Sequence, residues 1–212
     1  GGASTELLDE CRQRGLIEYD DEWVWYRHEL VRTAMCDSLT ITQRRHLNKV
    51  ILRELIAQRA DVARIVHHAP EAAEDTHIAQ YAPAAARQAS SAASHREAIA
   101  HYRLAATYST GTSDEERAAL LSDYAVECYL ANEVSEALDT SEEALELWAK
   151  LGAAERQGDL LRWQSRFHWW LGQVAAAEKT GKAAVELLEA VPDASGLAMA
   201  YSTMSQLAML AQ

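Results

Sequence analysis

Similar stretches recur through the last two-thirds of the chain, with a period of about 40 residues. The alanines that align them, Ala98, Ala137 and Ala177, are almost equally spaced. The segments before the second and later stretches keep the same period, since they begin at Asp114, Ala154 and Ala194. A period of this length is typical of a solenoid, in which each repeat buries its apolar face against its neighbours. The sequence therefore predicts stacked helix–turn–helix repeats, and an ordinary helical bundle with chance spacing is the alternative.

Capping and close-packing signals indicate where these helices begin and end. Ser94 with Glu97, and Ser113 with Glu116, have the spacing of capping boxes, in which hydroxyl and carboxylate satisfy free backbone N–H groups reciprocally. Glycines stand where helices should end, at Gly111 and Gly152. Alanines seven residues apart lie on one helix face and let a paired helix approach closely, at Ala98/Ala105, Ala137/Ala144 and Ala177/Ala184.

Composition supports an all-α chain and excludes several classes of protein. Only three prolines and nine glycines occur in 212 residues, too few for the many turns of a β-sandwich. No run of eighteen apolar residues is present, so we expect no membrane span. A net charge of −12 opposes binding of nucleic acid through its phosphates. Three scattered cysteines indicate a reduced, cytoplasmic protein without a disulfide framework or zinc knuckle.

The N-terminal third has a different pattern from the repeats. An amphipathic helix is expected over residues 5–14, ended by Gly15, followed by strands at 16–19 and 23–26 around an acidic turn. A helix to about Ser38 follows, then one capped by Thr40 with Gln43 and running to about Gln58, then one from Asp61 to Ala69. The order helix, hairpin, helix is that of the back half of a winged helix.

Two resemblances follow from these patterns. Residues 129–138 and 170–177 resemble the turn between the two helices of a tetratricopeptide repeat, with a longer period than usual. Residues 15–39 resemble the winged-helix end of a STAND-class ATPase, in particular the large LuxR-family, MalT-like transcriptional regulators of actinobacteria. Residues 61–69 and 81–87 are similar to that family's connector into its repeats.

The charge pattern and the resemblance together suggest three parts. Residues 1–69 hold ten basic against eleven acidic side chains, whereas residues 70–212 hold ten against twenty-one, which suggests a seam near residues 67–70. We expect the C-terminal half of a winged helix over 1–40, a helical connector over 41–70, and tetratricopeptide-like repeats over 71–212, the last one truncated. An evenly acidic helical surface is the alternative reading of the charge shift. Because the chain opens with Gly-Gly-Ala, we expect it to be a segment of a longer polypeptide.

The resemblance implies a regulatory function without catalysis in this segment. In such regulators an upstream P-loop ATPase binds ATP or ADP and a downstream helix-turn-helix binds DNA. No G-x-x-x-x-G-K-S/T motif occurs here, so no cofactor is expected in this chain. The expected role is that of a cytoplasmic sensor and coupling arm that binds an unidentified inducer, either a ligand or a protein. The same arm in an ATPase fused to a nucleotide cyclase or kinase, and a peptide-binding adaptor, are the alternatives.

His28 is the candidate that the resemblance singles out. In STAND-class proteins a winged-helix histidine contacts the phosphates of ADP, and His28 stands at the strand-to-helix junction where that role belongs. An imidazole beside free helix N–H groups can donate to a phosphate oxygen. A histidine that caps its own helix or simply packs is the open alternative.

The repeats themselves suggest a ligand groove. The first helix of each pair in a solenoid lines the concave face. Aligning the repeats places the following side chains there: Tyr129, Arg162, Arg166, Trp169, Gln206 and Met209. Arginines beside an indole suit an anionic or aromatic ligand. A second stripe with the same spacing, Trp163, Phe167 and Trp170, is expected to pack between helices, and Trp169 covering a neighbouring helix is the alternative to a groove.

Other polar clusters are expected to be structural. His67 and His68 are adjacent on a helix and point about 100° apart, so with His77 we expect no metal site. Cys36 and Cys128 have the pattern of small buried hydrophobes. A basic stripe, Arg44, Arg45, Lys49 and Arg53, is expected to face the ATPase domain or solvent and not DNA.

Overall fold

A computed structural model describes residues 5–21, 23–109 and 111–210. Within these residues the chain forms eleven α-helices and one two-stranded antiparallel hairpin, which confirms the expected all-α helical-repeat fold with one β-hairpin. The elements are α1 (Thr5–Gln13), β1 (Ile17–Tyr19), β2 (Val24–Tyr26), α2 (Glu29–Ser38), α3 (Ile41–Ala57), α4 (Val62–Ala72), α5 (Asp75–Ser91), α6 (His95–Tyr108), α7 (Asp114–Leu130), α8 (Val134–Lys150), α9 (Ala154–Trp170), α10 (Val174–Glu189) and α11 (Leu197–Leu210).

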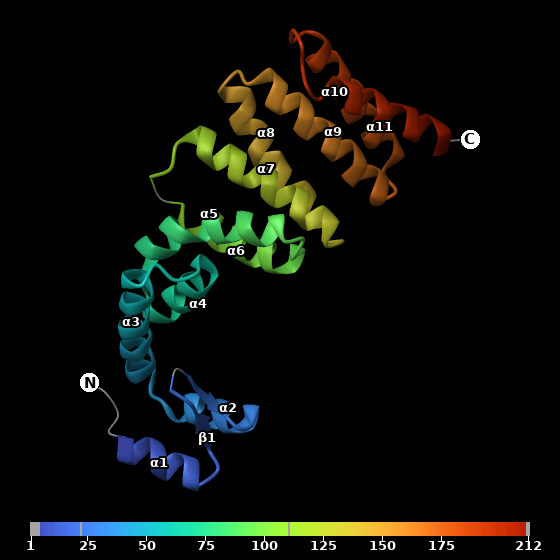
Figure 1. Ribbon diagram of the computed structural model, residues 1–212. Helices are drawn as coiled ribbons and strands as arrows, with labels where there is room; N and C mark the ends of the chain where they lie inside the picture. The colour runs from blue at the N-terminus through green and yellow to red at the C-terminus, as the bar shows by residue number, and fades with distance from the viewer. Residues whose placement is uncertain (1–4, 22, 110, 211–212) are drawn as a thin grey trace.

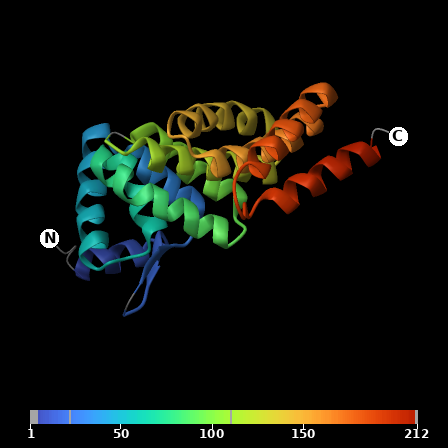
Figure 2. The same ribbon diagram turned by 90° about the horizontal axis from the view of Figure 1, so that it is seen from above.

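The helices from α3 onward stack in pairs along an arc (Figure 1). Each helix packs on the next one in the chain, and α9 also contacts α7 and α11. Figure 2, turned by 90°, shows the two chain ends at opposite ends of this stack. In a solenoid of this kind each unit contacts only its neighbours, so the shape follows from the geometry of one pair.

The α1–hairpin–α2 unit lies at the N-terminal end of the arc (Figure 1). Gly15, with φ +70°, ends the first helix as expected, because a left-handed residue there carries no Cβ penalty. The hairpin pairs Ile17 with Tyr26 and Tyr19 with Val24. Ile17 is the buried side chain of β1, whereas every residue of β2 is exposed. The unit therefore has the expected element order but buries little apolar surface of its own.

The boundary expected at residue 70 does not separate two packing units. Residues 67–70 lie inside α4, and Ala69 and Ala72 are completely buried between α3 and α5. One apolar cluster extends from Leu52 of α3 to Ala105 of α6 across that position. The helical stack therefore begins at α3, and the charge shift near residue 70 marks a change in surface composition within a continuous core.

The turn inside each helix pair repeats almost unchanged. Its middle residue has a positive φ, at Ala93, Asn132 and Gly172. The next N–H donates to a carbonyl five residues earlier, in the bonds Ser94 to Ala89 (2.9 Å), Glu133 to Cys128 (2.8 Å) and Gln173 to His168 (2.8 Å). This is the Schellman pattern of a helix end. The same turn also joins α8 to α9, where Gly152 has a positive φ and the Ala153 N–H donates to Trp148 at 3.0 Å, so short turns of one kind connect helices both within and between pairs.

The expectation of a capping box at Ser94 is wrong, and this turn explains why. Ser94 has ψ 62° and its side chain makes no cap hydrogen bond, since its backbone closes the preceding turn. Thr40 and Ser113 have ψ 157° and 156°, the extended conformation that aims the hydroxyl at the helix start. Both form complete capping boxes, as expected, with Gln43 and Glu116.

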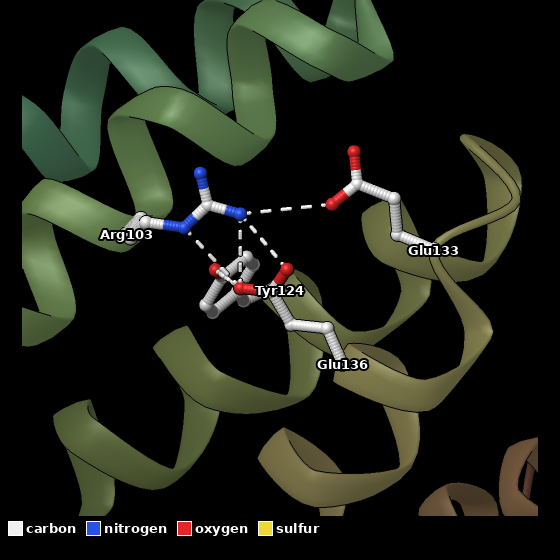
Figure 3. Close-up of polar contacts among 4 residues, drawn as sticks. All are labelled: Arg103, Tyr124, Glu133 and Glu136. Carbon is white, nitrogen blue, oxygen red and sulfur yellow. Dashed lines mark hydrogen bonds and ion pairs between the residues drawn. The ribbon is translucent and has the colours of Figure 1, made fainter.

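A polar cluster between α6, α7 and α8 links neighbouring pairs (Figure 3). Arg103 donates to Glu136 at 2.8 and 3.0 Å and lies 3.6 Å from Glu133, and the Tyr124 hydroxyl also donates to Glu136. Partial burial opposes ionisation of Glu136, but the hydrogen bonds from Arg103 and Tyr124 outweigh it and lower the pKa of that carboxyl below its ordinary value. The carboxylate is therefore held in its charged form.

No helix among residues 5–21, 23–109 and 111–210 is long and apolar enough to cross a membrane.

Replacing the two serines separates a real cap from an apparent one. Ser113→Ala should lower the free energy of unfolding by about 1 kcal/mol, because the N–H of Glu116 loses its acceptor. Ser94→Ala, the matched control at an exposed helix start, should change it by less than about 0.5 kcal/mol. Urea denaturation of both variants measures this difference, and equal losses would contradict the assignment.

The Glu136 contact should give stability a defined pH dependence. A carboxyl whose pKa is lowered by folding contributes stability above its unfolded pKa, near 4.5, and loses it as pH falls through the lower folded value. Glu136→Gln should therefore cost about 1 kcal/mol at pH 7, and this cost should shrink below pH 4.5. Denaturation as a function of pH measures it. Glu146→Gln, an exposed carboxyl on the same helix, is the control and should show no such loss.

Candidate ligand pocket between α7, α9 and α11

Four of the six expected groove residues line one small pocket. This pocket, of about 70 Å³, lies between α7, α9 and α11, the first helices of three successive pairs. It is lined by Tyr129, Arg166, Trp169, Thr203, Gln206 and Leu207. Trp169 is 37% exposed, so its indole is partly accessible at the pocket, and Trp169 covering a neighbouring helix stays the alternative. The alignment of the repeats therefore predicted correctly that residues far apart in the chain, from Tyr129 to Gln206, lie close together.

Arg166 is the cation at the pocket. One terminal nitrogen donates to the Tyr129 hydroxyl at 3.3 Å, and the guanidinium carbon lies 5.6 Å from the ring centres of both Tyr129 and Trp163. Its Nε is buried and has no hydrogen-bond partner among the described residues. The aromatic faces stabilise the cation through cation–π attraction but supply no acceptor for that nitrogen. The guanidinium thus keeps donor capacity for a ligand.

An aromatic cluster forms the floor beside Arg166. The Tyr129 ring lies 5.8 Å from Trp163 and 5.3 Å from Phe167, and the Phe167 side chain is completely buried. These contacts confirm that Trp163 and Phe167 pack between α7 and α9. Trp170, expected to pack with them, contacts Tyr129 at 6.3 Å but remains 55% exposed, because the helix ends there and little chain covers it.

Two expected groove residues lie outside the pocket. Arg162 is 7% exposed and binds Asp159 on its own helix, through nitrogens at 2.8 and 2.9 Å from one carboxylate oxygen. Arg162 and Arg166 are four residues apart on one helix, as expected, but the Arg162 guanidinium is already paired with Asp159. Met209 is 67% exposed and does not line the pocket, since it lies nearly one turn beyond Gln206. Neither residue is a groove ligand in this structure.

Sequence reasoning missed two lining residues and one buried acid. Thr203 lies three residues before Gln206 and Leu207 lies four residues after Thr203, so helical periodicity starting from Gln206 would have found both. Glu127 is 5% exposed and accepts a hydrogen bond from Ser90 at 2.5 Å and shares one with His95 at 2.8 Å. Its partners are 37 and 32 residues away, and no local pattern in the sequence reveals such pairs.

His28 lies where the sequence placed it. It is the N-cap of α2, directly after β2, with an extended backbone at φ −137° and ψ 139°. Its side chain is exposed and makes no hydrogen bond to the start of α2, so the imidazole itself does not cap the helix. The imidazole is therefore accessible beside the free N–H groups at the start of α2.

Several of the remaining polar candidates have protein partners. Lys49 pairs with Glu74 at 2.8 Å, and Arg44 donates to the Cys36 carbonyl at 3.0 Å, so two members of the basic stripe are already engaged. His68 lies 2.7 Å from the side-chain oxygen of Asn48. Desolvation lowers the pKa of His68, which favours a neutral ring at that contact. Among residues 5–21, 23–109 and 111–210, no three His, Cys, Asp or Glu side chains are grouped as metal ligands.

Comparison with known proteins supports the fold alone. No family model matches the chain, and no curated protein matches it either. Among solved structures, the crystal structure of BtubC (BKLC) from P. vanneervenii is similar, with a TM-score of 0.54 and 14% sequence identity over 82% of this chain and 68% of that one. At this identity the likeness shows a shared helical-repeat architecture and carries no information about ligands.

The Arg162–Asp159 pair should be structural. Asp159→Asn should lower the free energy of unfolding by about 2 kcal/mol, because it leaves the buried guanidinium without its counter-charge. Asp139→Asn, at an exposed position of α8, is the matched control and should have little effect. Chemical denaturation at pH 7 measures both, and equal stabilities of the two variants would contradict this role.

Proposed function

We propose that this chain is the sensor and coupling arm of a bacterial ATP-dependent transcriptional regulator. The observation that carries the proposal is the pocket between three successive repeats, in which Arg166 keeps an unsatisfied buried donor beside the exposed indole of Trp169. A pocket formed by residues from separate repeats lets a signal ligand bias their relative arrangement. The arm has no catalytic role, and its inducer is a ligand or protein present in the cytoplasm.

The N-terminal unit supports the coupling part of this role. Trp23, Trp25 and Leu30 are 59%, 47% and 82% exposed. Exposed apolar side chains that form one patch mark interaction sites, and these three lie within eight residues of the chain. We infer that this face contacts an ATPase domain of the same polypeptide. His28 stands on the same unit, at the position from which it would reach the phosphates of ADP.

The arm would then connect two ligands in a single equilibrium. Bound ADP would hold the closed state through His28, whereas the inducer would bind the repeats and favour the open, ATP-bound state. Such coupling requires that each ligand bind the two states with different affinity. The downstream partner in this proposal is a helix-turn-helix domain that binds DNA. A nucleotide cyclase or kinase as output domain, or a free peptide-binding adaptor, are the competing proposals.

The gene product that contains this segment tests the proposal. Its sequence should have a P-loop domain before the segment and a helix-turn-helix after it, and a cyclase or kinase domain there would favour the competing proposal. In the purified complete protein, His28→Ala should weaken ADP binding by about tenfold, because one charge-assisted contact to phosphate is lost. His46→Ala, an exposed histidine of α3, is the control and should bind ADP normally. Isothermal titration calorimetry measures both.

The 212-residue chain by itself should lack the two activities that the proposal assigns to other domains. It should not hydrolyse ATP and should not retard random duplex DNA at about 0.15 M salt, where an acidic module is repelled by the phosphates. Tight, salt-sensitive retardation that is lost in Arg45→Ala would instead make α3 a DNA-binding helix and contradict the proposal.

A further inference from the structure

We propose that the pocket between α7, α9 and α11 binds a small organic monocarboxylate whose body is apolar or aromatic. The inference rests on the proposed function, because it assigns a chemical class to the inducer of the same pocket. Three properties of the pocket lead to it: the state of Arg166, the volume and polarity of the lining, and the exposed indole at its mouth.

Arg166 is the pocket residue suited to an anion. Other arginines of this acidic chain form ion pairs with carboxylates, among them Arg103 with Glu136, Arg117 with Glu143, and Arg162 with Asp159. Arg166 has no acidic partner within 4 Å in the described part of the chain, and its buried Nε has no acceptor. A buried donor without a partner is costly, and for a charged group the cost is larger. A carboxylate in the pocket would supply the charged acceptor that the Arg166 guanidinium lacks among the described residues.

The lining favours a small ligand that carries one negative charge. None of the six lining residues is acidic, and Arg166 is the only cation among them, so one unit of negative charge is balanced and two are not. Tyr129 and Gln206 add a hydroxyl and an amide that can donate to carboxylate oxygens. The volume of the pocket, about 70 Å³, is small. The pocket therefore favours a small anionic head group, and drug- or nucleotide-sized ligands normally occupy cavities several times larger.

The rest of the ligand would lie against apolar surface. Leu207 closes one side of the pocket at 8% exposure, and Trp169 stands beside it with more than a third of its surface accessible. An aryl or branched alkyl group attached to the carboxylate would cover this indole and gain stacking or dispersion contact. A ligand without such a body would keep the ion pair and lose this contact.

Binding would also join repeats that touch little. The carboxylate would contact Tyr129 of α7, Arg166 of α9 and Gln206 of α11 at once, and Gln206 makes no hydrogen bond to another described residue in the free chain. The ligand would thus add contacts between three successive pairs, which is the kind of differential interaction that shifts a conformational equilibrium. This gives the proposed sensor a physical means of responding.

Phenylacetate is the probe, titrated into the 212-residue chain by calorimetry and by quenching of tryptophan fluorescence. It should bind, whereas phenylacetamide, which has the same shape without the charge, should bind at least about tenfold more weakly. Acetate, which lacks the ring, and inorganic phosphate, which carries more charge, should also be weaker. Equal binding of the acid and the amide, tighter binding of phosphate, or no binding of phenylacetate at millimolar concentration would each overturn the proposal.

Three variants connect binding to the pocket. Arg166→Gln should weaken phenylacetate by about 10- to 100-fold, and Gln206→Ala, on the far wall, by about three- to tenfold. Arg156→Gln, an exposed arginine of the same helix outside the pocket, is the matched control and should bind as the parent does. Circular dichroism checks that each variant is folded. If Arg166→Gln unfolds, Gln206→Ala still tests the pocket, since α11 retains its buried residues. Unchanged affinity for phenylacetate in a folded Arg166→Gln or in Gln206→Ala would overturn the assignment.

The outcomes separate this inference from the proposed function. Carboxylate binding that depends on Arg166, in a gene product without a P-loop or helix-turn-helix, would retain the pocket and reject the regulatory role. A gene product with both domains whose repeats ignore carboxylates would retain the role and reject the ligand class.

Discussion

Close approach of paired helices at small residues is the constraint on which the rest of this structure depends. Ala98, Ala137 and Ala177 are completely buried near the starts of α6, α8 and α10. Between α9 and α10 the approach is tighter still, since a Cβ added to Gly158 would lie 2.6 Å from Leu188. Larger side chains would push the helices apart and rotate the outward face of α9. Because Arg166 and Trp169 stand on that helix, the pocket exists only at this spacing.

The repeat period predicted the fold well, and its failures have local causes. α7 and α9 begin at the expected Asp114 and Ala154, since identical three-residue turns keep the period constant. α11 begins at Leu197 and not at Ala194, because a longer turn that includes Asp193 at φ 55° follows α10. The charge shift near residue 70 does not coincide with a break in the apolar core, since surface charge does not report where apolar side chains stop packing.

Helical periodicity predicted which residues of the pocket share a face but not which of them are already engaged. It grouped Arg162 with Arg166, and both are near aromatic rings, yet Asp159 binds the first, and no carboxylate of the described chain lies within reach of the second. The Asp159–Arg162 contact could be predicted from the sequence, because the two residues are three apart on one helix. Whether an acid from another helix approaches Arg166 depends on tertiary packing, as the buried Glu127 with its distant partners also illustrates.

The distribution of ion pairs connects the pocket to the rest of the arm. Ion pairs lie at the margins of the helix contacts: Arg103 to Glu136 joins α6 to α8 across two pairs, and Arg117 to Glu143 and Lys150 to Asp114 join α7 to α8 within one pair. Exposed pairs of this kind contribute little stability each, so they fix orientation more than they hold the stack together. In a solenoid a change at α9 and α11 reaches α3 only through each intermediate pair. A ligand that neutralises Arg166 would act at one end of this series, and the exposed N-terminal unit with His28 stands at the other.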